Sequence, residues 1–134
     1  MLMRTFVAIA LLAAPTASAC TSLPPDAAGA AEVAQAFHTA LHVADRTTLC
    51  ALLAEATAEQ VEKTTHSTCP DGILDRQIPD ADRVHDVSAY GRAAQVRMNG
   101  DTVFLTREGE SWKIAAAGCQ YQGNEPYDCV LEGK

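Results

Sequence analysis

Two histidines in the N-terminal half have a spacing that could bind a metal ion. His38 and His42 are four residues apart, so on a helix both side chains would lie on one face. A helical pair needs a third ligand from elsewhere, and no Glu follows His38 as it would in an H-E-x-x-H motif. The pair also flanks an apolar stripe, which is typical of a polar helix border. We therefore predict no metal site and no cofactor, and keep His38 as a possible pocket residue.

A third histidine could act as a general base. His85 lies in a segment of alternating polar and apolar residues, where it would share a face with Val87 and Ala89. A His beside a carboxylate is the usual acid–base pair. The possible carboxylate partners are Asp82, Asp86 and Asp128. If the strand faces the other way, His85 is exposed to solvent, so we treat it as a possible pocket residue without a catalytic role.

Aromatic and acidic residues offer further options for a site. Tyr127 and Trp112 could line a pocket, because aromatic side chains commonly do. We expect Trp112 to fill the core instead, and Tyr127 to pack its C-terminal segment. Five aspartates do not have calcium-loop spacing and favour a solvated acidic face. They are Asp71, Asp75, Asp80, Asp82 and Asp86. Motifs for nucleotide binding or serine hydrolysis do not occur in the sequence, so we predict no catalytic residue.

Composition limits the class of protein. The chain has 134 residues, with 10 Lys and Arg against 17 Asp and Glu, and a formal charge of −7. This acidic balance argues against nucleic-acid binding, which needs a basic patch. An apolar fraction of 48% argues against disorder. The length suffices for one domain.

The first residues have the features of an export signal. Residues 1–19 contain one positive charge, Arg4, then an apolar stretch and small residues before Cys20, which predicts a signal peptide. The last positions resemble a bacterial lipobox, although Ala17 stands where Leu is usual. Cys20 is the odd one of five cysteines, and we predict that it carries a lipid. The partner of this anchor would be the membrane, at the outer face of the cell. The alternative is a secreted protein cleaved after Ala19.

The remaining cysteines predict a disulfide framework behind a short spacer. Residues 20–29 are rich in Pro, Ala and Gly and read as a flexible tether, which leaves residues 30–134 as one domain. Cys50, Cys69, Cys119 and Cys129 allow three connectivities. We expect the local pairing, Cys50–Cys69 and Cys119–Cys129, because it keeps each bridge within one substructure. Export argues against free thiols, and a C-x-x-C redox motif does not occur.

The apolar pattern predicts helices first and strands afterwards. Expected helices are Ala30–Ala44, Arg46–Glu55 and Ala58–Thr65, followed by an irregular segment, Asp71–Asp82. Asp45 fits an N-cap, and Thr57 with Gln60 fits a capping box. Expected strands are Arg83–Ala89, Ala93–Met98, Thr102–Arg107 and Ser111–Gly118, with a possible fifth at Tyr127–Leu131. Asn99-Gly100 predicts a type I′ hairpin turn.

The expected fold class is α+β: two to three N-terminal helices packed on a curved antiparallel meander sheet of four to five strands. This arrangement resembles the cone-shaped fold of nuclear transport factor 2 and its relatives, which include polyketide cyclases and small dehydratases. The run from Trp112 to Cys119, the segment Pro126-Tyr127-Asp128-Cys129 and the first cysteine, Cys50, resemble small uncharacterised actinobacterial lipoproteins. The resemblance implies an exported, lipid-anchored, cone-like domain and brings no catalytic residues.

Two functions remain open on the sequence alone. We predict a non-catalytic extracytoplasmic domain that binds a surface protein or a small ligand. The alternative is a small cone-fold enzyme of the isomerase, dehydratase or hydrolase type, with a pocket His as base. An enzyme needs an open pocket with convergent polar groups. A cone interior filled by core side chains would argue against it, and the expected fillers are Met98, Phe104, Leu105 and Trp112.

Overall fold

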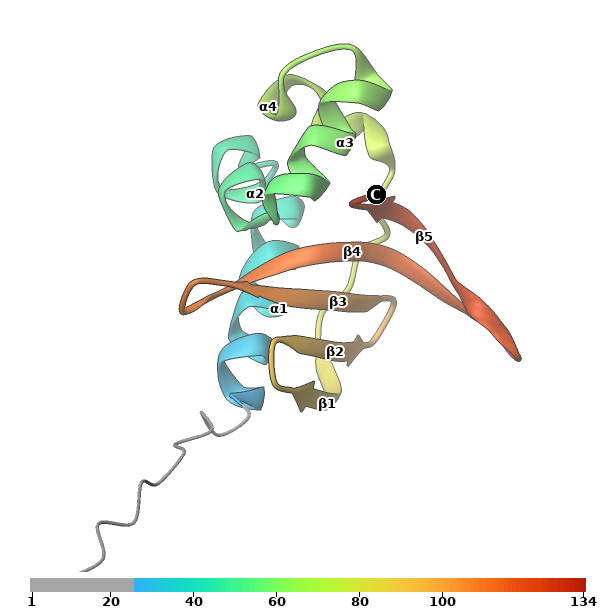
Figure 1. Cartoon of the computed structure of the whole chain (residues 1–134). Coiled ribbons are helices and arrows are strands. Elements are labelled where there is room, and N and C mark those ends of the chain that lie inside the picture. The colour runs from blue at the N-terminus through green and yellow to red at the C-terminus, as the bar shows by residue number, and fades with distance from the viewer. Residues whose placement is uncertain (1–25) are drawn as a thin grey trace, which may run out of the picture.

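Helices come first along the chain and strands follow, as Figure 1 shows for the computed structural model. The structure describes residues 26–134; the predicted signal peptide, Cys20 and most of the predicted tether lie outside them. The helices are α1 (Ala27–His42), α2 (Arg46–Leu52), α3 (Glu55–Thr65) and α4 (Cys69–Gly72), with a 3-10 turn, η1 (Ile73–Arg76). The strands are β1 (Val84–Tyr90), β2 (Ala93–Met98), β3 (Thr102–Glu108), β4 (Ser111–Gln122) and β5 (Glu125–Glu132). They form one antiparallel sheet in chain order, which confirms the α+β prediction.

Helix α1 begins three residues earlier than predicted, inside the expected tether. Asp26 is its N-cap, and Oδ1 of Asp26 accepts the Gly29 N–H at 2.9 Å. The other oxygen, Oδ2, accepts the indole N–H of Trp112 at 3.3 Å and lies 3.7 Å from the guanidinium of Arg107. One carboxylate therefore both starts the helix and ties it to the β3–β4 hairpin.

The predicted cap of α2 is confirmed, whereas the predicted start of α3 is wrong. Asp45 accepts hydrogen bonds from the Thr48 N–H at 3.1 Å and from the Thr48 hydroxyl at 2.6 Å. Helix α3 starts at Glu55, so Thr57 lies inside it. The Thr57 side chain is buried, and its hydroxyl donates to the Ala115 carbonyl of β4 at 2.9 Å. The Thr57 hydroxyl therefore bonds a carbonyl on a distant strand instead of capping the helix, as the capping box had predicted.

The Asp45 cap makes stability depend on pH. Hydrogen bonds from the Thr48 hydroxyl and then from its N–H lower the pKa of the Asp45 carboxyl from the ordinary 3.8. A depressed folded-state pKa contributes stability above the unfolded pKa, and this stability is lost as the pH falls through the folded pKa. Asp45→Asn keeps an amide oxygen at the cap without the charge. Thermal melts followed by circular dichroism should show a wild-type advantage at about pH 6 that shrinks toward about pH 2.5. A difference that stays constant over this range would contradict the interpretation.

The main core lies between α1 and one face of the sheet. Alternate residues of β2, β3 and β4 point toward the helices, as the period of two predicts. Buried side chains of this face are Ala94, Val96, Met98, Val103, Leu105, Trp112 and Ile114, and α1 contributes Ala30, Ala34 and Phe37. Phe104 is an exception to the expected filling, because it lies half-buried on the opposite face of β3. The interior between helices and sheet is thus filled by apolar side chains.

The β2–β3 turn differs from the predicted type I′ geometry. A type I′ turn needs positive φ at both central residues. Gly100 has a φ of +108°, whereas the φ of Asn99 is not positive. The turn is docked against residues 80–83, where the Asn99 N–H donates to the Arg83 carbonyl at 2.8 Å. A Cβ on Gly100 would lie 2.3 Å from the Asp80 carbonyl oxygen. Docking against this segment therefore decides the turn geometry, and only glycine fits the contact.

Both expected disulfides are present in the structure. Cys50–Cys69 joins α2 to the start of α4, and Cys119–Cys129 joins β4 to β5. The second bridge crosses a register pair of the ribbon formed by these two strands. The first bridge holds the short helix α4, and the second holds the β4–β5 ribbon.

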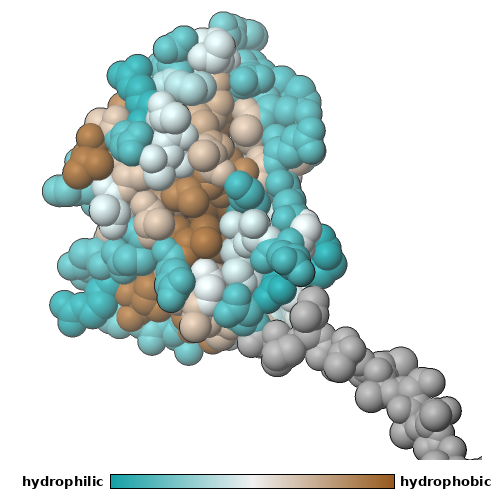
Figure 2. Space-filling view, turned by 90° about the vertical axis from the view of Figure 1, so that its left-hand side faces the viewer, coloured by the Kyte–Doolittle hydropathy of each residue, from teal (hydrophilic) through white to brown (hydrophobic). Residues whose placement is uncertain are grey.

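The side of the molecule where α1 and α2 lie carries an apolar strip within a mostly hydrophilic surface (Figure 2). Half-buried apolar side chains of these helices include Val33, Leu41 and Leu52, and Val43 is 65% exposed. None of the helices in residues 26–134 has the length and apolar character that a bilayer crossing requires.

Candidate functional site

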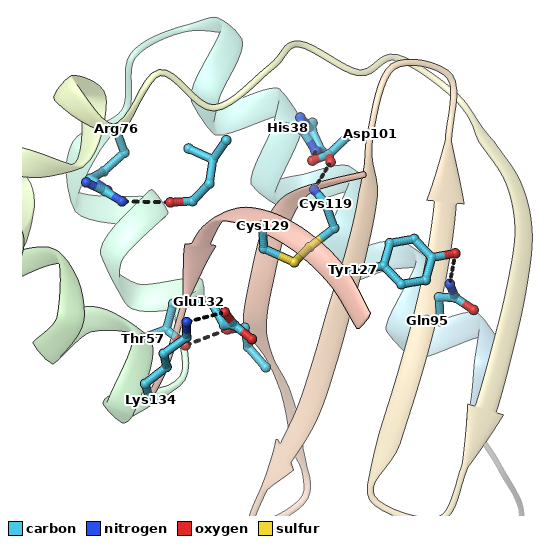
Figure 3. Close-up of a disulfide and its surroundings, with 12 residues drawn as sticks. His38, Thr57, Arg76, Gln95, Asp101, Cys119, Tyr127, Cys129, Glu132 and Lys134 are labelled. Carbon is cyan, nitrogen blue, oxygen red and sulfur yellow. Dashed lines mark hydrogen bonds and ion pairs between the residues drawn. A yellow bond between two sulfur atoms is a disulfide. The ribbon is translucent and has the colours of Figure 1, made fainter. Parts of the chain in front are cut away.

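A buried histidine–aspartate pair joins α1 to the sheet. His38 Nε2 lies 2.9 Å from Asp101 Oδ2, and both side chains are 0% exposed. An ionised carboxylate can only accept, so Nε2 is the donor of this bond. The other oxygen, Oδ1 of Asp101, accepts the backbone N–H of Cys119 at 3.2 Å. One carboxylate therefore connects α1, the end of the β2–β3 turn and β4, as Figure 3 shows.

The sequence predicted that His38 lies at a polar helix border, but the residue is buried. It is on the inner side of α1, where the Phe37 ring packs edge-on against it with centroids 5.4 Å apart. A buried imidazole is stable only with a hydrogen-bond partner, and Asp101 supplies it. His42, one turn further along α1, is exposed. The two histidines thus have different environments, although their helical spacing is the one expected.

Sequence reasoning missed Asp101, although a signal for it was present. The buried face of β3 includes Val103 and Leu105. Counting back by two along this strand places residue 101 on the same face. A carboxylate at such a position needs a buried donor, and a histidine on the apolar helix is the simplest supplier.

The second ring nitrogen of His38 has no partner among residues 26–134. His38 Nδ1 is buried and makes no hydrogen bond. With Nε2 bound to Asp101, Nδ1 is the remaining ring nitrogen, which accepts a hydrogen bond in an imidazole and donates one in an imidazolium. An unpaired buried polar atom costs about 1–3 kcal/mol. A hydrogen-bond partner from outside the described residues would remove this cost.

A hollow of about 630 Å³ borders this histidine. It lies between α1, the segment before β1 and the β2–β3 turn. Its lining residues are Gln35, His38, Thr39, His42, Asp80, Ala81, Asp82, Asn99 and Gly100. The lining includes the exposed carboxylates of Asp80 and Asp82 and no Lys or Arg. Such walls accept hydrogen bonds and repel anions, so the hollow suits a small ligand that is rich in N–H or O–H donors.

Within the described part of the chain, no group of three or more His, Cys, Asp or Glu residues is placed to hold a metal ion. His42 is exposed at the end of α1. It lines the same hollow as Asp80 and Asp82, but these three side chains do not form a metal-binding group. The helical His pair therefore does not gain the third ligand that a metal site needs.

His85 does not reach this hollow or the interior. The register of β1 against β2 shifts between Val84 and Asp86, so His85 is the extra residue of a bulge and is exposed. The prediction that His85 shares a face with Val87 and Ala89 is wrong, because a bulge changes the direction of the side chains around it. Its possible partner Asp86 is bound instead by Arg97, at 2.8 Å.

Tyr127 lies at a second, separate hollow on the other face of the sheet. Its hydroxyl accepts a hydrogen bond from Gln95 Nε2 at 3.0 Å, and its ring packs against Phe104 with centroids 5.1 Å apart. The hollow beside it measures about 390 Å³. Trp112 is buried in the core, as expected. The three possible pocket residues of the sequence analysis thus lie apart: His38 at one hollow, Tyr127 at another and His85 exposed to solvent.

Comparison with known proteins gives no match: no protein-family model fits the sequence, and no curated protein or solved structure is significantly similar to it.

Proposed function

We propose that this chain is an exported domain, lipid-anchored through Cys20 at the outer face of the cell membrane, that binds a small polar ligand in the hollow beside His38. The observation that carries the binding role is the hollow walled by the exposed carboxylates of Asp80 and Asp82, with His38 in its lining. The carboxylates would bind N–H or O–H groups of the ligand, and a shift of the His38 ring toward the hollow would give the unpaired Nδ1 a partner.

Two observations support export. The described residues contain two disulfides, which persist in oxidising compartments outside the cytoplasm. The fifth cysteine, Cys20, follows an apolar segment with small residues at its end. A lipid on this thiol accounts for the cysteine that the two bridges leave over.

The packing supports binding rather than catalysis. Met98, Leu105 and Trp112 are buried between helices and sheet, where a cone-fold enzyme would need an open pocket. Both oxygens of Asp101 already accept hydrogen bonds. This carboxylate is therefore engaged in holding His38 and β4 in place.

One observation favours the enzyme as a second candidate. A histidine oriented by a carboxylate at 2.9 Å is the arrangement of a general base. The base would be Nδ1, which is buried. This candidate requires that a bound compound is converted, whereas a binding domain releases it unchanged. Mass spectrometry of the compound after prolonged incubation with the protein separates the two.

A titration followed by NMR tests the binding hollow. Glucosamine offers an ammonium group and several hydroxyl donors, and it should shift the amide signals of Thr39, Asp82 and Gly100 in the ¹⁵N-labelled protein. The double variant Asp80→Asn/Asp82→Asn should bind at least about tenfold more weakly, because charge-assisted hydrogen bonds are lost. Asp128→Asn removes a similar exposed charge on β5 and should bind like the wild type. Shifts that persist unchanged in the double variant would contradict the proposal.

An intact-mass measurement tests the anchor. Protein from the membrane fraction is alkylated without reduction. We expect a lipid on an N-terminal Cys20 and no alkylated thiol, because the other four cysteines are bridged. A soluble protein with one alkylated thiol at Cys20 would contradict the anchor. The variant Cys20→Ser should leave the membrane fraction while keeping the same melting temperature.

A further inference from the structure

The β4–β5 ribbon folds back over the face of the sheet that the helices do not cover. Tyr127 belongs to β5, yet its hydroxyl is 3.0 Å from Gln95 of β2, three strands away in the sheet order. Neighbouring strands are about 4.8 Å apart, so a flat sheet would separate β5 from β2 by about 14 Å. Figure 3 shows Tyr127 reaching across the strands toward Gln95. The ribbon therefore curls and forms one wall of an open hollow of about 390 Å³.

Three features fix this curl. Gly118 has a φ of +66°, and a Cβ there would lie 2.8 Å from the Val130 side chain. The Cys119–Cys129 bridge ties the two strands next to this glycine. From the helical side, the Arg76 guanidinium donates to the Val130 carbonyl at 2.7 Å. The hollow is thus a built part of the fold and not a gap beside a free end.

Two aromatic rings form a corner of this hollow. Phe104 and Tyr127 both line it, with ring planes at 73° to each other. Tyr121 packs against Tyr127 with centroids 5.6 Å apart and is 72% exposed. Gln95 holds the Tyr127 hydroxyl, which fixes the ring direction. The faces of these rings carry the negative part of the aromatic quadrupole, to which cations are attracted.

The residues of β5 around this corner are acidic. Glu132 lines the hollow, and β5 carries Glu125, Asp128 and Glu132 but no Lys or Arg. The Lys134 ammonium lies 3.3 Å from the Glu132 carboxylate in an exposed ion pair, so a bound cation would replace this lysine at Glu132. Aromatic faces and a carboxylate together are the two elements that recognise alkylammonium and guanidinium groups.

We propose that this hollow binds an organic cation, with the charge over the Phe104 and Tyr127 rings and Glu132 as its counter-ion. The site is on the opposite face of the sheet from the buried His38–Asp101 pair, and it does not depend on the function proposed for that hollow. The cation is an alkylammonium or guanidinium group, either of a free small molecule or of a side chain in a bound peptide.

Calorimetric titration with three probes tests the charge. Choline carries a quaternary ammonium, N-acetyl-arginine amide carries a guanidinium, and 3,3-dimethylbutanol is a neutral analogue of choline with nearly the same shape. Choline or the arginine amide should bind at least about tenfold more tightly than the neutral analogue. Preference for choline indicates a free ammonium ligand, and preference for the arginine amide indicates a peptide side chain. Equal affinity for the neutral analogue would overturn the proposal.

Matched variants test the residues. Tyr127→Leu should reduce cation binding at least about tenfold. Tyr127→Phe keeps the ring but loses the hydrogen bond from Gln95, so its binding should fall by no more than about threefold. Glu132→Gln should weaken binding at least about threefold with an unchanged melting temperature, which keeps the test valid if Tyr127→Leu loosens the ribbon. Tyr90→Leu removes a tyrosine that is 74% exposed on β1 and is the control. Binding unaffected by both Tyr127→Leu and Glu132→Gln would also overturn the proposal.

Discussion

The variant Asp101→Ala should lower the free energy of unfolding by about 2–6 kcal/mol, because two buried groups each lose a hydrogen-bond partner at a cost of about 1–3 kcal/mol. The substitution leaves His38 Nε2 and the Cys119 N–H without partners, both at positions that solvent does not reach. Each unpaired buried group carries its desolvation cost into the folded state. Urea denaturation followed by tryptophan fluorescence measures the loss, because Trp112 is buried in the same core.

Two further variants distinguish the loss of the His38–Asp101 hydrogen bond from the loss of one negative charge. Asp101→Asn keeps the shape and one acceptor oxygen, so it should be destabilised less than Asp101→Ala. Asp80→Asn changes an exposed carboxylate near the same turn and should stay within about 0.5 kcal/mol of the wild type. A loss of less than about 1 kcal/mol for Asp101→Ala would mean that water replaces the carboxylate, and the pair would not hold α1 on the sheet.

The double variant Cys50→Ala/Cys69→Ala should lose about 3 kcal/mol of stability. These cysteines are 19 residues apart in the sequence, and their bridge restricts the unfolded chain across the whole of α3. The bridge also holds α4, a helix of only 4 residues that has little stability of its own. Equilibrium denaturation of wild type and variant under non-reducing conditions gives the difference.

The second bridge is the matched control for the first. Cys119 and Cys129 are only 10 residues apart, so Cys119→Ala/Cys129→Ala should lose about 0.5 kcal/mol less in the chain-entropy account. Its effect should be local instead: amide hydrogen exchange should accelerate in β5 while the β2–β3 hairpin stays protected. Uniformly faster exchange across the sheet would show that the ribbon is not a separate unit. A larger loss than for the first bridge would contradict the loop-length argument.

Local sequence signals were sufficient for most of the elements. Asp45 followed by Thr48 predicts an N-cap because the cap is formed within three residues. The alternation of Ala94, Val96 and Met98 predicts β2 with its observed ends, since one buried face imposes a period of two. Local pairing of the cysteines also follows from the layout of these elements.

Two helix starts differ from the predicted ones for different reasons. Helix α1 starts early because Asp26 caps it locally through the Gly29 N–H, and contacts with Trp112 and Arg107 add to this. Thr57 lies inside α3, where its hydroxyl bonds a carbonyl of β4. This last acceptor lies outside the sequence window that a capping pattern uses.

In the candidate sites, more depends on tertiary contacts and less on local sequence than in the helices and strands. The sequence alone predicted that His38 and Tyr127 could line a pocket, and it determined the α+β class and the pairing of the four cysteines. Only the tertiary structure paired His38 with Asp101, which is 63 residues away, and turned His85 to solvent through a bulge. Tyr127 meets Gln95 because the ribbon curls back over the sheet. The physical reason is that periodicity fixes which face of an element a side chain occupies, whereas packing between elements decides what that face meets.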